Sequence, residues 1–580
     1  MTAQTVCFKI AGEAGQGINV SALTLAKAFT RKGFHAFLLT ENPNSIKLEH
    51  NWCSLTVSDT EVCAQAHRVD ILVALNKEAI LKRQPEVINP GGFLLYDADS
   101  IALKEEEKIR GLTYVSVPLT RIVDQLKLSP LLRNTVAVGA LLALIDYDIK
   151  AMEDILEEQF GRKGGEVVRQ NIGAIEAGFK HIADNPPSVK ARRLKPPGTK
   201  PKMFINGNEA LSLAAIKAGC KFLSAYPMTP SSPIMHYLAS KEKDYNIVVK
   251  HTEDEIAAIH MAIGANYAGV RAMTCTSGGG FALMTEALGM AAQSETPLVV
   301  VVGQRPGPST GQPTHTSQGD LRFLLHASQG EFPRILIAPG DVDDCFRETF
   351  HAFNLAEQFQ VPVLILTDKY LAESYVSRDA LSLEGPQIRR GKLLTQGQLD
   401  AVSDYRRYAF TDDGISPRSI PGQKNGLHLA TSYEHDEYGY YQEDPVGVTK
   451  MMDKRFRKLA AIKAALKRPE LWGPAQADIT IVAWGSTKGP VLEAMQMLQA
   501  DKIRVNFLHL VYLWPFPSEA VAKVLKGAKA TVGIEGNKTG QMIGLIKEQT
   551  GLGLDHAFLQ YNGQPFYPVD IYTKVKELLA

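Results

Sequence analysis

Four polar turns between residues 226 and 311 each follow a short apolar run of β-strand character. They occupy residues 226–233, 252–255, 274–280 and 303–311. Apolar runs that alternate with helical patterns predict the parallel strands of an α/β fold. Because such folds bind ligands beyond the carboxyl ends of their strands, this stretch of sequence predicts a binding site.

The length and charge of the chain exclude several classes of protein. Its 580 residues predict about three or four domains. The formal net charge of +1 gives no electrostatic reason to expect a nucleic acid or an anionic membrane as a partner. No apolar run is as long as a membrane span, and residues 1–9 lack the features of a signal peptide. We therefore expect a cytoplasmic protein that binds neither nucleic acid nor membrane.

The sequence contains no recognisable metal-binding pattern. None of the six cysteines has CxxC spacing, and they are Cys7, Cys53, Cys63, Cys220, Cys275 and Cys345. Neither an intrinsic iron–sulfur cluster nor a structural zinc is expected, and the thiols are predicted to be reduced and buried. Four residues have side chains that suit a metal but a spacing that fits no signature, namely His428, His435, Asp436 and Glu437.

The segment 1–184 opens with a strand, a glycine-rich loop and a helix. An apolar run at 6–10 is followed by a loop that contains Gly12, Gly15, Gln16 and Gly17. Runs at 71–75 and 93–96 predict further parallel strands, so we expect an open doubly wound sheet. Backbone N–H groups of the loop could bind an anion at the helix N-terminus. A tight turn for strand–helix packing explains the same glycines, whose spacing differs from the dinucleotide-binding fingerprint.

Changes in composition divide the rest of the chain. Proline and basic residues at 185–202 predict an exposed, semi-rigid linker. The α/β pattern resumes at 203–385 and again at 475–580. Between these segments, residues 386–474 are rich in Gly, Pro, Tyr and charge, and their periodicity is weak. We interpret 386–474 as an extension that wraps a partner or covers a site.

The turn at 226–233 contains three prolines that fix its backbone, Pro227, Pro230 and Pro233. Such a stiff turn could hold the hydroxyl of Thr229 in place for a hydrogen bond to a small substrate. The alternative is a proline-rich turn in which Ser231 or Ser232 caps the next helix.

Two charged residues near the other turns are candidates for ligand binding. Glu255 lies near the start of a helix predicted at 253–268, where its carboxylate could bond a cofactor ring nitrogen. Stabilisation of the helix dipole explains at least one of the acids at 253–255 equally well. Arg305 follows a predicted strand and precedes Pro306, so its guanidinium is restrained and suited to bind a carboxylate.

Together these motifs resemble the 2-oxoacid:ferredoxin oxidoreductases, which use thiamine diphosphate and coenzyme A. Segments that resemble the α subunit of that family lie at 206–210, 226–230, 271–280 and 304–311. Its γ subunit is resembled at 12–17 and 134–137, and its transketolase C-terminal-like domain at 512–517 and 535–537. The order of γ before α is most similar to the α subunit of 2-oxoglutarate:ferredoxin oxidoreductase.

The resemblance implies three α/β domains. They are a Rossmann-like γ domain at 1–184, a pyrimidine-binding domain of the thiamine-diphosphate-binding fold at 203–385, and a transketolase C-terminal-like domain at 475–580. It also implies reversible oxidative decarboxylation of 2-oxoglutarate to succinyl-CoA and CO2, with electrons passed to ferredoxin.

The resemblance also assigns roles to individual residues. Thr229 and Arg305 would contact the 2-oxoacid, and Glu255 would bond N1′ of the aminopyrimidine. Thr229 and Pro230 would lie on the pyrimidine side of the cofactor. Coenzyme A would lie near the loop of Gly12, Gly15, Gln16 and Gly17.

Two motifs that this chemistry needs are absent from the chain. There is no Gly-Asp-Gly motif with the Asn that holds Mg²⁺ and diphosphate, because residues 412–414 are not followed by that pattern. Cysteines spaced for a cluster are also lacking. The resemblance therefore places Mg²⁺, the diphosphate half of the cofactor and a [4Fe–4S] cluster on a β subunit in an (αβ)₂ assembly, and this chain alone would be inactive.

Three other functions remain compatible with the motifs. The same chemistry could act on pyruvate or on a branched-chain or aryl 2-oxoacid. The chain could be a non-redox, thiamine-dependent subunit of the transketolase type, although the missing Gly-Asp-Gly motif argues against a self-sufficient one. It could also be a nucleotide-binding module without chemistry, although three α/β segments argue against so simple a role.

Overall fold

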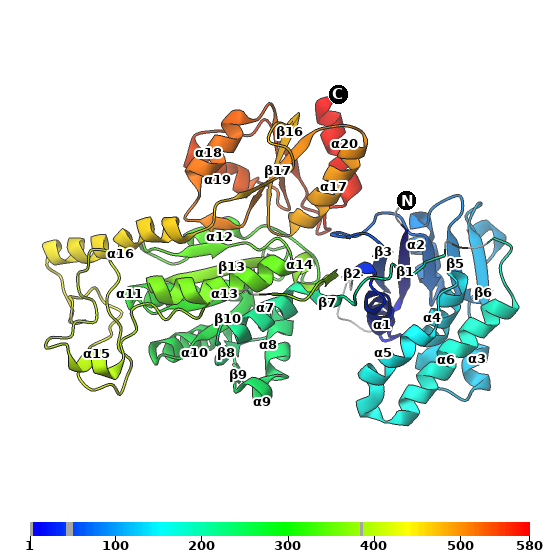
Figure 1. Ribbon diagram of the computed structural model, residues 1–580, viewed down its shortest axis with the longest axis horizontal. Helices are drawn as coiled ribbons and strands as arrows, with labels where there is room; N and C mark the ends of the chain where they lie inside the picture. Colours follow the sequence, from blue (N-terminus) through cyan, green and yellow to red (C-terminus); the bar gives the residue numbers. More distant parts are fainter. Residues whose placement is uncertain (1–3, 42–49, 190, 192, 383–386) are drawn as a thin grey trace. The chain divides into compact units, whose positions relative to one another are not determined.

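The computed structural model describes residues 4–41, 50–189, 191, 193–382 and 387–580 (Figure 1). Contacts divide the chain into two compact units. The first unit comprises Met1–Ile205, Glu373–Leu381 and Tyr567–Thr573, and the second comprises Asn206–Ala372, Ser382–Phe566 and Lys574–Ala580. The predicted boundary at residue 385 lies outside the described residues, and the other predicted domain limits stay predictions.

Strands in three separate sheets, with helices between them, confirm the predicted α/β class. One sheet has eight strands, one has seven and one has five. The eight-stranded sheet belongs to the first unit and the other two sheets to the second. Within the part of the chain that the structure describes, no helix combines the length and the hydropathy needed to cross a membrane.

The sheet of the first unit is parallel on one side and mixed on the other. Its strands lie in the order β6 (Thr113–Val117), β5 (Phe93–Asp97), β4 (Ile71–Ala74), β1 (Thr5–Glu13), β3 (His50–Ser58), β2 (His35–Glu41), β14 (Tyr375–Arg378) and β7 (Met203–Asn206). The first four run parallel, whereas β3 is antiparallel to both β1 and β2. The predicted doubly wound sheet therefore exists for β1, β4, β5 and β6, and antiparallel strands extend it.

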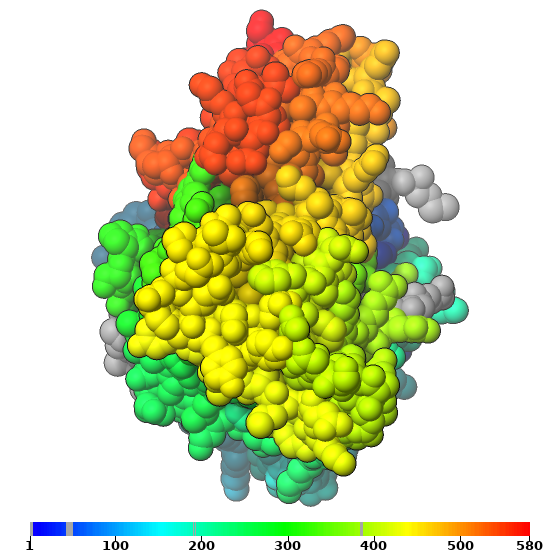
Figure 2. Space-filling model, turned by 90° about the vertical axis from the view of Figure 1, so that its left-hand side faces the viewer, coloured from blue at the N-terminus to red at the C-terminus, as the bar shows by residue number. Residues whose placement is uncertain are grey.

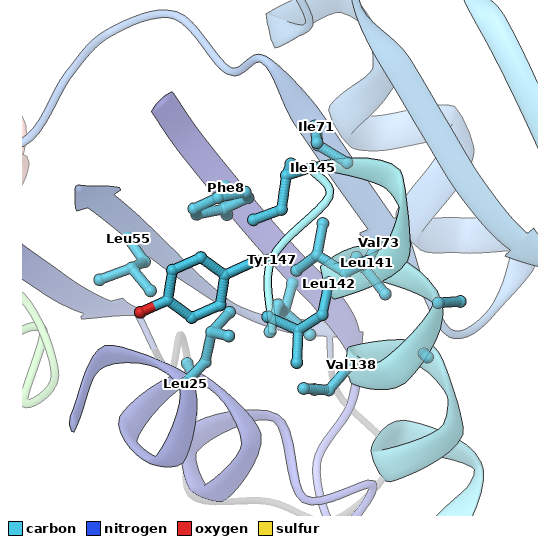
Figure 3. Packing of buried hydrophobic residues seen from close by; sticks show 14 of the residues in the cluster. Phe8, Leu25, Leu55, Ile71, Val73, Val138, Leu141, Leu142, Ile145 and Tyr147 are labelled. Carbon is cyan, nitrogen blue, oxygen red and sulfur yellow. The ribbon is translucent and has the colours of Figure 1, made fainter. Parts of the chain in front are cut away.

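Among the described residues of the first unit, the α-helices that precede the linker accompany its strands. They are α1 (Ile18–Arg31), α2 (Lys77–Arg83), α3 (Leu119–Gln125), α4 (Arg133–Leu144), α5 (Lys150–Phe160) and α6 (Gly165–Asp184). Figure 3 shows side chains of α1 and α4 meeting those of β1, β3 and β4 in one apolar core. Helix α4 is buried on nearly all sides because Gly139 and Gly178 allow α6 to approach closely. A Cβ at position 139 would overlap the carbonyl oxygen of Ile175.

The described end of the predicted linker lies on the first unit. Leu194 is 2% exposed and belongs to the same apolar core. Thr199 donates its hydroxyl to the carbonyl oxygen of Gly33 at 2.8 Å, and the backbone N–H of Lys202 donates to that of Thr30 at 3.0 Å. These contacts hold residues 193–202 against the turn that follows α1.

The seven-stranded sheet of the second unit is parallel except at one edge. Its strands lie in the order β18 (Tyr512–Trp514), β12 (Ile335–Ile337), β13 (Pro362–Asp368), β11 (Leu298–Gln304), β10 (Ala272–Ser277), β8 (Phe222–Ala225) and β9 (Val248–His251). Only β18 pairs antiparallel. Every residue of β11 is buried, which explains its continuous apolar sequence, because a parallel strand is covered on both faces.

The helices that connect these strands follow the usual α/β alternation. They are α7 (Gly207–Lys217), α8 (Ser232–Ala239), α9 (Glu242–Tyr245), α10 (Glu255–Tyr267), α11 (Gly278–Gln293), α12 (Leu321–His326), α13 (Val342–Phe359) and α14 (Lys369–Glu373). Helix α10 starts two residues later than expected, because Asp254 caps it by accepting a hydrogen bond from the N–H of Ala257 at 2.8 Å. Glu253 therefore lies outside the helix.

The five-stranded sheet shares its core with the seven-stranded one. Its strands lie in the order β15 (Glu470–Trp472), β17 (Val505–Leu510), β16 (Ile479–Trp484), β19 (Thr531–Glu535) and β20 (His556–Leu559). Its helices are α17 (Lys488–Ala500), α18 (Ser518–Gly527) and α19 (Gln541–Thr550), whereas α20 (Pro568–Leu579) is divided between the two units. Trp484 and Leu513 belong to the same buried cluster as Phe281 of α11.

The extension at 387–474 is irregular except for α15 (Gln396–Asp400), α16 (Pro445–Ala465) and β15. Figure 2 looks onto this extension, which covers much of the visible face in yellow. Buried ion pairs hold it, since Lys454 and Lys458 of α16 both donate to the carboxylate of Glu295. Glu295 lies just beyond α11, where cations also offset the negative end of the helix dipole.

Candidate functional site

The four predicted turns meet at one edge of the seven-stranded sheet. They follow β8, β9, β10 and β11, which are neighbours in that sheet and run parallel. One of them differs from the expected form. Residues 274–277 belong to β10, and α11 begins at once with Gly278, so the strand passes directly into the helix.

The loop at 226–233 is held from three sides. The side-chain amide of Asn208 in α7 donates to the carbonyl oxygen of Pro230 at 2.9 Å. The ring of Pro230 lies against Gly303, where a Cβ would come within 2.8 Å of Cγ. Ser231 is the N-cap residue of α8, but its hydroxyl donates to the carbonyl oxygen of Met228 at 2.9 Å rather than capping the helix.

Arg305 contacts this loop directly. Its Nη1 donates to the carbonyl oxygen of Thr229 at 2.9 Å, which brings two of the predicted substrate-binding residues together. Burial lowers the pKa of Arg305, and the carboxylate of Asp320 opposes that shift. Arg305 is partly buried and Thr229 is at the same sheet edge, so the guanidinium and the Thr229 hydroxyl lie close to one another.

Asp320 is a residue of this site that sequence reasoning missed. Its backbone N–H donates to Oε1 of Gln304 at 3.0 Å, which closes the base of the loop that carries Arg305. Burial raises the pKa of its carboxyl to about 6, against the lowering effect of Arg305. The carboxylate lies beside Gly278, where a Cβ would be 2.6 Å from Oδ2. No local motif marks Asp320, because its proximity to Arg305 depends on the path of the loop.

Glu255 is the buried carboxylate of the site. It is the first residue of α10 and is 3% exposed. Burial raises the pKa of Glu255; a hydrogen bond to its own backbone opposes this shift, and the nearby Asp254 adds to it. Its Oε1 is buried and has no hydrogen-bond partner within the described residues. A buried polar atom without a partner in a native fold calls for an explanation, and a bound group is one.

Gly280 forms the surface against which Glu255 rests. A Cβ at position 280 would lie 2.6 Å from Oε1 of Glu255 and would overlap Oγ1 of Thr276. The sulfur of Met228 lies 4.0 Å from that Thr276 oxygen, so Gly280 and Glu255 are linked to the Thr229 loop. The structure thus brings Thr229, Pro230, Glu255 and Arg305 to one sheet edge.

The residues around Glu255 fit the pyrimidine ring of thiamine diphosphate. The free Oε1 of Glu255 is suited to a ring nitrogen, and the lack of a side chain at Gly280 leaves room for the Glu255 carboxylate itself. Ser277, at the end of β10, also has a buried hydroxyl without a partner in the described residues. The same part of the chain contains no group of three or more His, Cys, Asp or Glu side chains placed to hold a metal ion.

The helices next to the site expose apolar side chains. Ile256 and Met261 of α10 are 46% and 38% exposed, and Leu283 of α11 is 51% exposed. We call these three residues the apolar patch. Because α10 and α11 share one buried core, the patch lies on adjoining helices that both begin at the site.

In the first unit, the glycine loop forms part of a pocket of ≈ 300 Å³. Gly15 and Gly17 have positive φ angles of 97° and 73°, which glycine adopts without strain. The side chain of Gln16 folds back, so that Oε1 accepts the N–H of Glu13 at 2.9 Å near Gly12. Asn134 of α4 donates to the carbonyl oxygen of Gln16 at 2.9 Å. Lys163 lies on the lining of the same pocket.

The remaining candidates have structural partners. His428 Nε2 lies 3.1 Å from the hydroxyl of Tyr267, and His435 Nε2 lies 3.2 Å from the carbonyl oxygen of Gln293. Both histidines fasten the extension to the C-terminal parts of α10 and α11. Asp436 and Glu437 bond backbone groups and Arg406. Asp413 accepts from Lys392 at 2.8 Å.

Three family models match consecutive parts of the chain. Residues 7–181 match "Pyruvate ferredoxin/flavodoxin oxidoreductase". Residues 213–454 match "Pyruvate flavodoxin/ferredoxin oxidoreductase, thiamine diP-bdg", and residues 477–571 match "Pyruvate:ferredoxin oxidoreductase core domain II".

Curated relatives and a solved structure match over most or all of the chain. The α subunit of 2-oxoacid:ferredoxin oxidoreductase 2 from Aeropyrum pernix is 32% identical over 98% of this chain and 97% of its own. The 2-oxoglutarate synthase subunit KorA from Methanothermobacter marburgensis is 32% identical over 64% of this chain and 98% of its own. The 2-oxoglutarate:ferredoxin oxidoreductase from Magnetococcus marinus, solved with 2-oxoglutarate, coenzyme A and succinyl-CoA, has a TM-score of 0.92 at 34% identity and full coverage of both chains.

Proposed function

Because this chain belongs to the 2-oxoacid:ferredoxin oxidoreductase family as an α subunit, we propose that it acts on 2-oxoglutarate. The reaction is the reversible oxidative decarboxylation of 2-oxoglutarate to succinyl-CoA and CO2. Electrons pass to ferredoxin through a β subunit. The observation that carries this proposal is the convergence of Thr229, Arg305 and the unpartnered carboxylate oxygen of Glu255 at one sheet edge.

The choice of 2-oxoglutarate rests on relatives as well as on the site. Arg305 can pair with the carboxylate that every 2-oxoacid carries, so it does not discriminate among them. The names of the relatives from M. marburgensis and M. marinus both specify 2-oxoglutarate, which favours it over pyruvate and over branched-chain or aryl 2-oxoacids. The second carboxylate of 2-oxoglutarate needs a further cation, which we assign to the partner subunit.

In the proposed reaction, the residues of this chain bind and orient the 2-oxoacid and the cofactor. Arg305 holds the substrate carboxylate, and the Thr229 hydroxyl donates to a substrate oxygen. Glu255 keeps a proton shared with a ring nitrogen, a role that its raised pKa supports. Thiamine diphosphate, when bound, supplies the electron sink that makes decarboxylation possible. Thr229 and Pro230 line the pyrimidine side.

We infer that the rest of the site comes from the partner. The β subunit would hold Mg²⁺ and the diphosphate of the cofactor, carry the [4Fe–4S] cluster and deliver electrons to ferredoxin. The apolar patch beside the site supports docking there, because Ile256, Met261 and Leu283 would otherwise stay in water. An (αβ)₂ assembly places two such sites in one cytoplasmic enzyme.

Coenzyme A is proposed to bind the first unit near Gly12, Gly15, Gln16 and Gly17. The first turn of α1 has no acidic residue and no side-chain cap, so its N–H groups remain suited to an anion. The adjacent pocket contributes Lys163 and Asn134. The ammonium group of Lys163 and the side-chain amide of Asn134 can both donate hydrogen bonds to phosphate oxygens.

The direct test of the function is reduction of a low-potential dye by the copurified complex. The purified α–β complex is mixed with coenzyme A and, separately, with 2-oxoglutarate, pyruvate, a branched-chain and an aryl 2-oxoacid. Dye reduction that is fastest with 2-oxoglutarate is expected. Faster reduction with another 2-oxoacid would reassign the substrate, and no reduction with any of them would refute the proposal.

Replacement of Arg305 by alanine is expected to lower kcat/KM for the 2-oxoacid by about 10- to 100-fold. The physical reason is the loss of a charge-assisted pair, worth on the order of 1.5–3 kcal/mol. Arg305→Lys should recover part of the loss, because it keeps the charge but not the planar fork. Steady-state kinetics on the complex measure both variants, and an unchanged kcat/KM in Arg305→Ala would remove Arg305 from the site.

A further inference from the structure

The loop that carries Arg305 leaves the sheet at β11 and returns at Asp320. Its outer part is exposed at residues 307–312. Its base is closed by the bond from the Asp320 N–H to Gln304. The return leg, residues 313–320, connects this exposed part to Asp320, whose carboxylate interacts with Arg305.

Gln318 ties this return leg to the five-stranded module, which is the sheet of β15, β16, β17, β19 and β20 with its helices. Its Nε2 donates to the carbonyl oxygen of Trp484 at the end of β16, at 2.9 Å. Its Oε1 accepts the N–H of Gly536, and its own N–H donates to the carbonyl oxygen of Gly536, both at 2.8 Å. Asn537 Nδ2 donates to the carbonyl oxygen of Gln318 at 3.0 Å. Every polar atom of Gln318 thus has a partner in that module, and the residue is 3% exposed.

Neighbouring residues add to this attachment. Gln541 of α19 donates to the carbonyl oxygen of Gly319 at 2.7 Å and accepts the N–H of Arg322 at 2.9 Å. The N–H of Thr316 donates to the carbonyl oxygen of Gly563 at 3.2 Å. A cavity of only ≈ 20 Å³ remains beside Gln318, so the contact is closely packed.

We propose that Gln318 is a positioning residue for 2-oxoacid binding. By fixing residues 316–320 to the ends of β16 and β19, it sets the place of Asp320 and the closure of the loop that presents Arg305. The five-stranded module then has a defined part in the reaction, which is to hold the substrate-binding loop in its binding geometry. The inference rests on the proposed role of Arg305 in binding the 2-oxoacid.

A positioning role for Gln318 differs in its effects from a role that merely joins two modules. Replacement of a merely joining residue should lower stability and leave the affinity for each substrate unchanged. Replacement of a residue that positions the Arg305 loop should raise KM for the 2-oxoacid, because small displacements of binding groups have large effects on affinity. The same replacement should leave KM for coenzyme A unchanged.

The test uses Gln318→Met in the copurified complex. Methionine has nearly the same volume and removes both side-chain hydrogen bonds. We expect KM for the 2-oxoacid to rise about tenfold, with kcat and KM for coenzyme A within about twofold of wild type. Gln541→Leu, which loses the bonds to Gly319 and Arg322, should show a smaller rise of the same kind. It also decides the question if Gln318→Met does not assemble.

Tyr512→Phe is the matched control. The Tyr512 hydroxyl of β18 bonds Glu348 of α13 at the edge of the seven-stranded sheet, where β12 and β13 separate it from β11 and the Arg305 loop. Its loss should lower the thermal midpoint without changing KM for the 2-oxoacid. The inference is refuted if Gln318→Met assembles with a wild-type KM, or if Tyr512→Phe raises that KM equally. Absence of activity in the wild-type complex would instead refute the proposed function.

Discussion

Glu255→Ala is expected to lower turnover of the assembled complex by at least about 10²- to 10⁴-fold, the range for a positioned proton-transfer group. The structure gives the reason, because Oε1 of Glu255 is buried and has no protein partner in the described residues. The carboxylate that lies against Gly280 is lost in this variant. Stopped-flow dye reduction measures the loss, and calorimetric titration with thiamine diphosphate measures the accompanying loss of cofactor affinity.

Glu253→Ala is the matched control for this variant. Glu253 is an exposed acid two residues earlier in the same turn, outside α10 and away from the buried edge. It should retain wild-type turnover and cofactor affinity. The α and β subunits should copurify equally in both variants. Near-normal turnover in Glu255→Ala would remove Glu255 from the mechanism, whatever its effect on stability.

The second large effect is expected from Gly280→Ala. Alanine is usually better than glycine inside a helix by about 1 kcal/mol, so helix propensity alone would make this variant more stable. Its Cβ, however, would lie 2.6 Å from Oε1 of Glu255 and overlap Oγ1 of Thr276. We expect Glu255 to be displaced, turnover to fall by about 10²-fold or more, and the free energy of unfolding to fall by about 1–3 kcal/mol.

Gly279→Ala provides the comparison, since a Cβ at that neighbouring position would meet only the sulfur of Met228, at 3.9 Å. Its loss of turnover should be at least about tenfold smaller, and its thermal midpoint should not fall. Turnover and thermal unfolding are measured on both complexes side by side. Equal kinetic effects in the two variants would show that contact with Glu255 is not what requires glycine at 280.

The sequence predicted the parts of the site that depend on local pattern. Arg305 directly follows β11, Thr229 lies in the turn after β8, and parallel strands bring their carboxyl ends to one edge. Gln318 had no such signal, because its partners Trp484 and Gly536 lie 166 and 218 residues further along the chain. A glutamine after a proline-rich loop is ordinarily exposed, and only the packing of two modules makes it buried.

In the extension, too, the burial of charged residues could not be predicted from the local sequence. Lys454 and Lys458 lie in a helix whose sequence is rich in lysine and arginine, which usually indicates a solvated surface. Their burial depends on the carboxylate of Glu295, more than 150 residues earlier in the chain, and for Lys458 also on the carbonyl group of Gln360 just beyond α13. Pairing over that distance cannot be read from periodicity. Composition allowed the prediction of an irregular segment, but it did not allow the prediction of the buried ion pairs that hold this segment against the second unit.

The sheet of the first unit has a consequence for how this chain can be divided. Its strands β14 and β7 are supplied by residues 375–378 and 203–206, beyond the proline-rich segment that looks like a natural cutting point. A fragment that ends at residue 202 would lose both strands and leave β2 as a bare edge with unpaired backbone groups. Such an edge is a template for self-association. A soluble fragment of this unit would need a strand that replaces β14 beside β2. Division of the chain at residue 202 is therefore expected to require a change that protects the edge of β2.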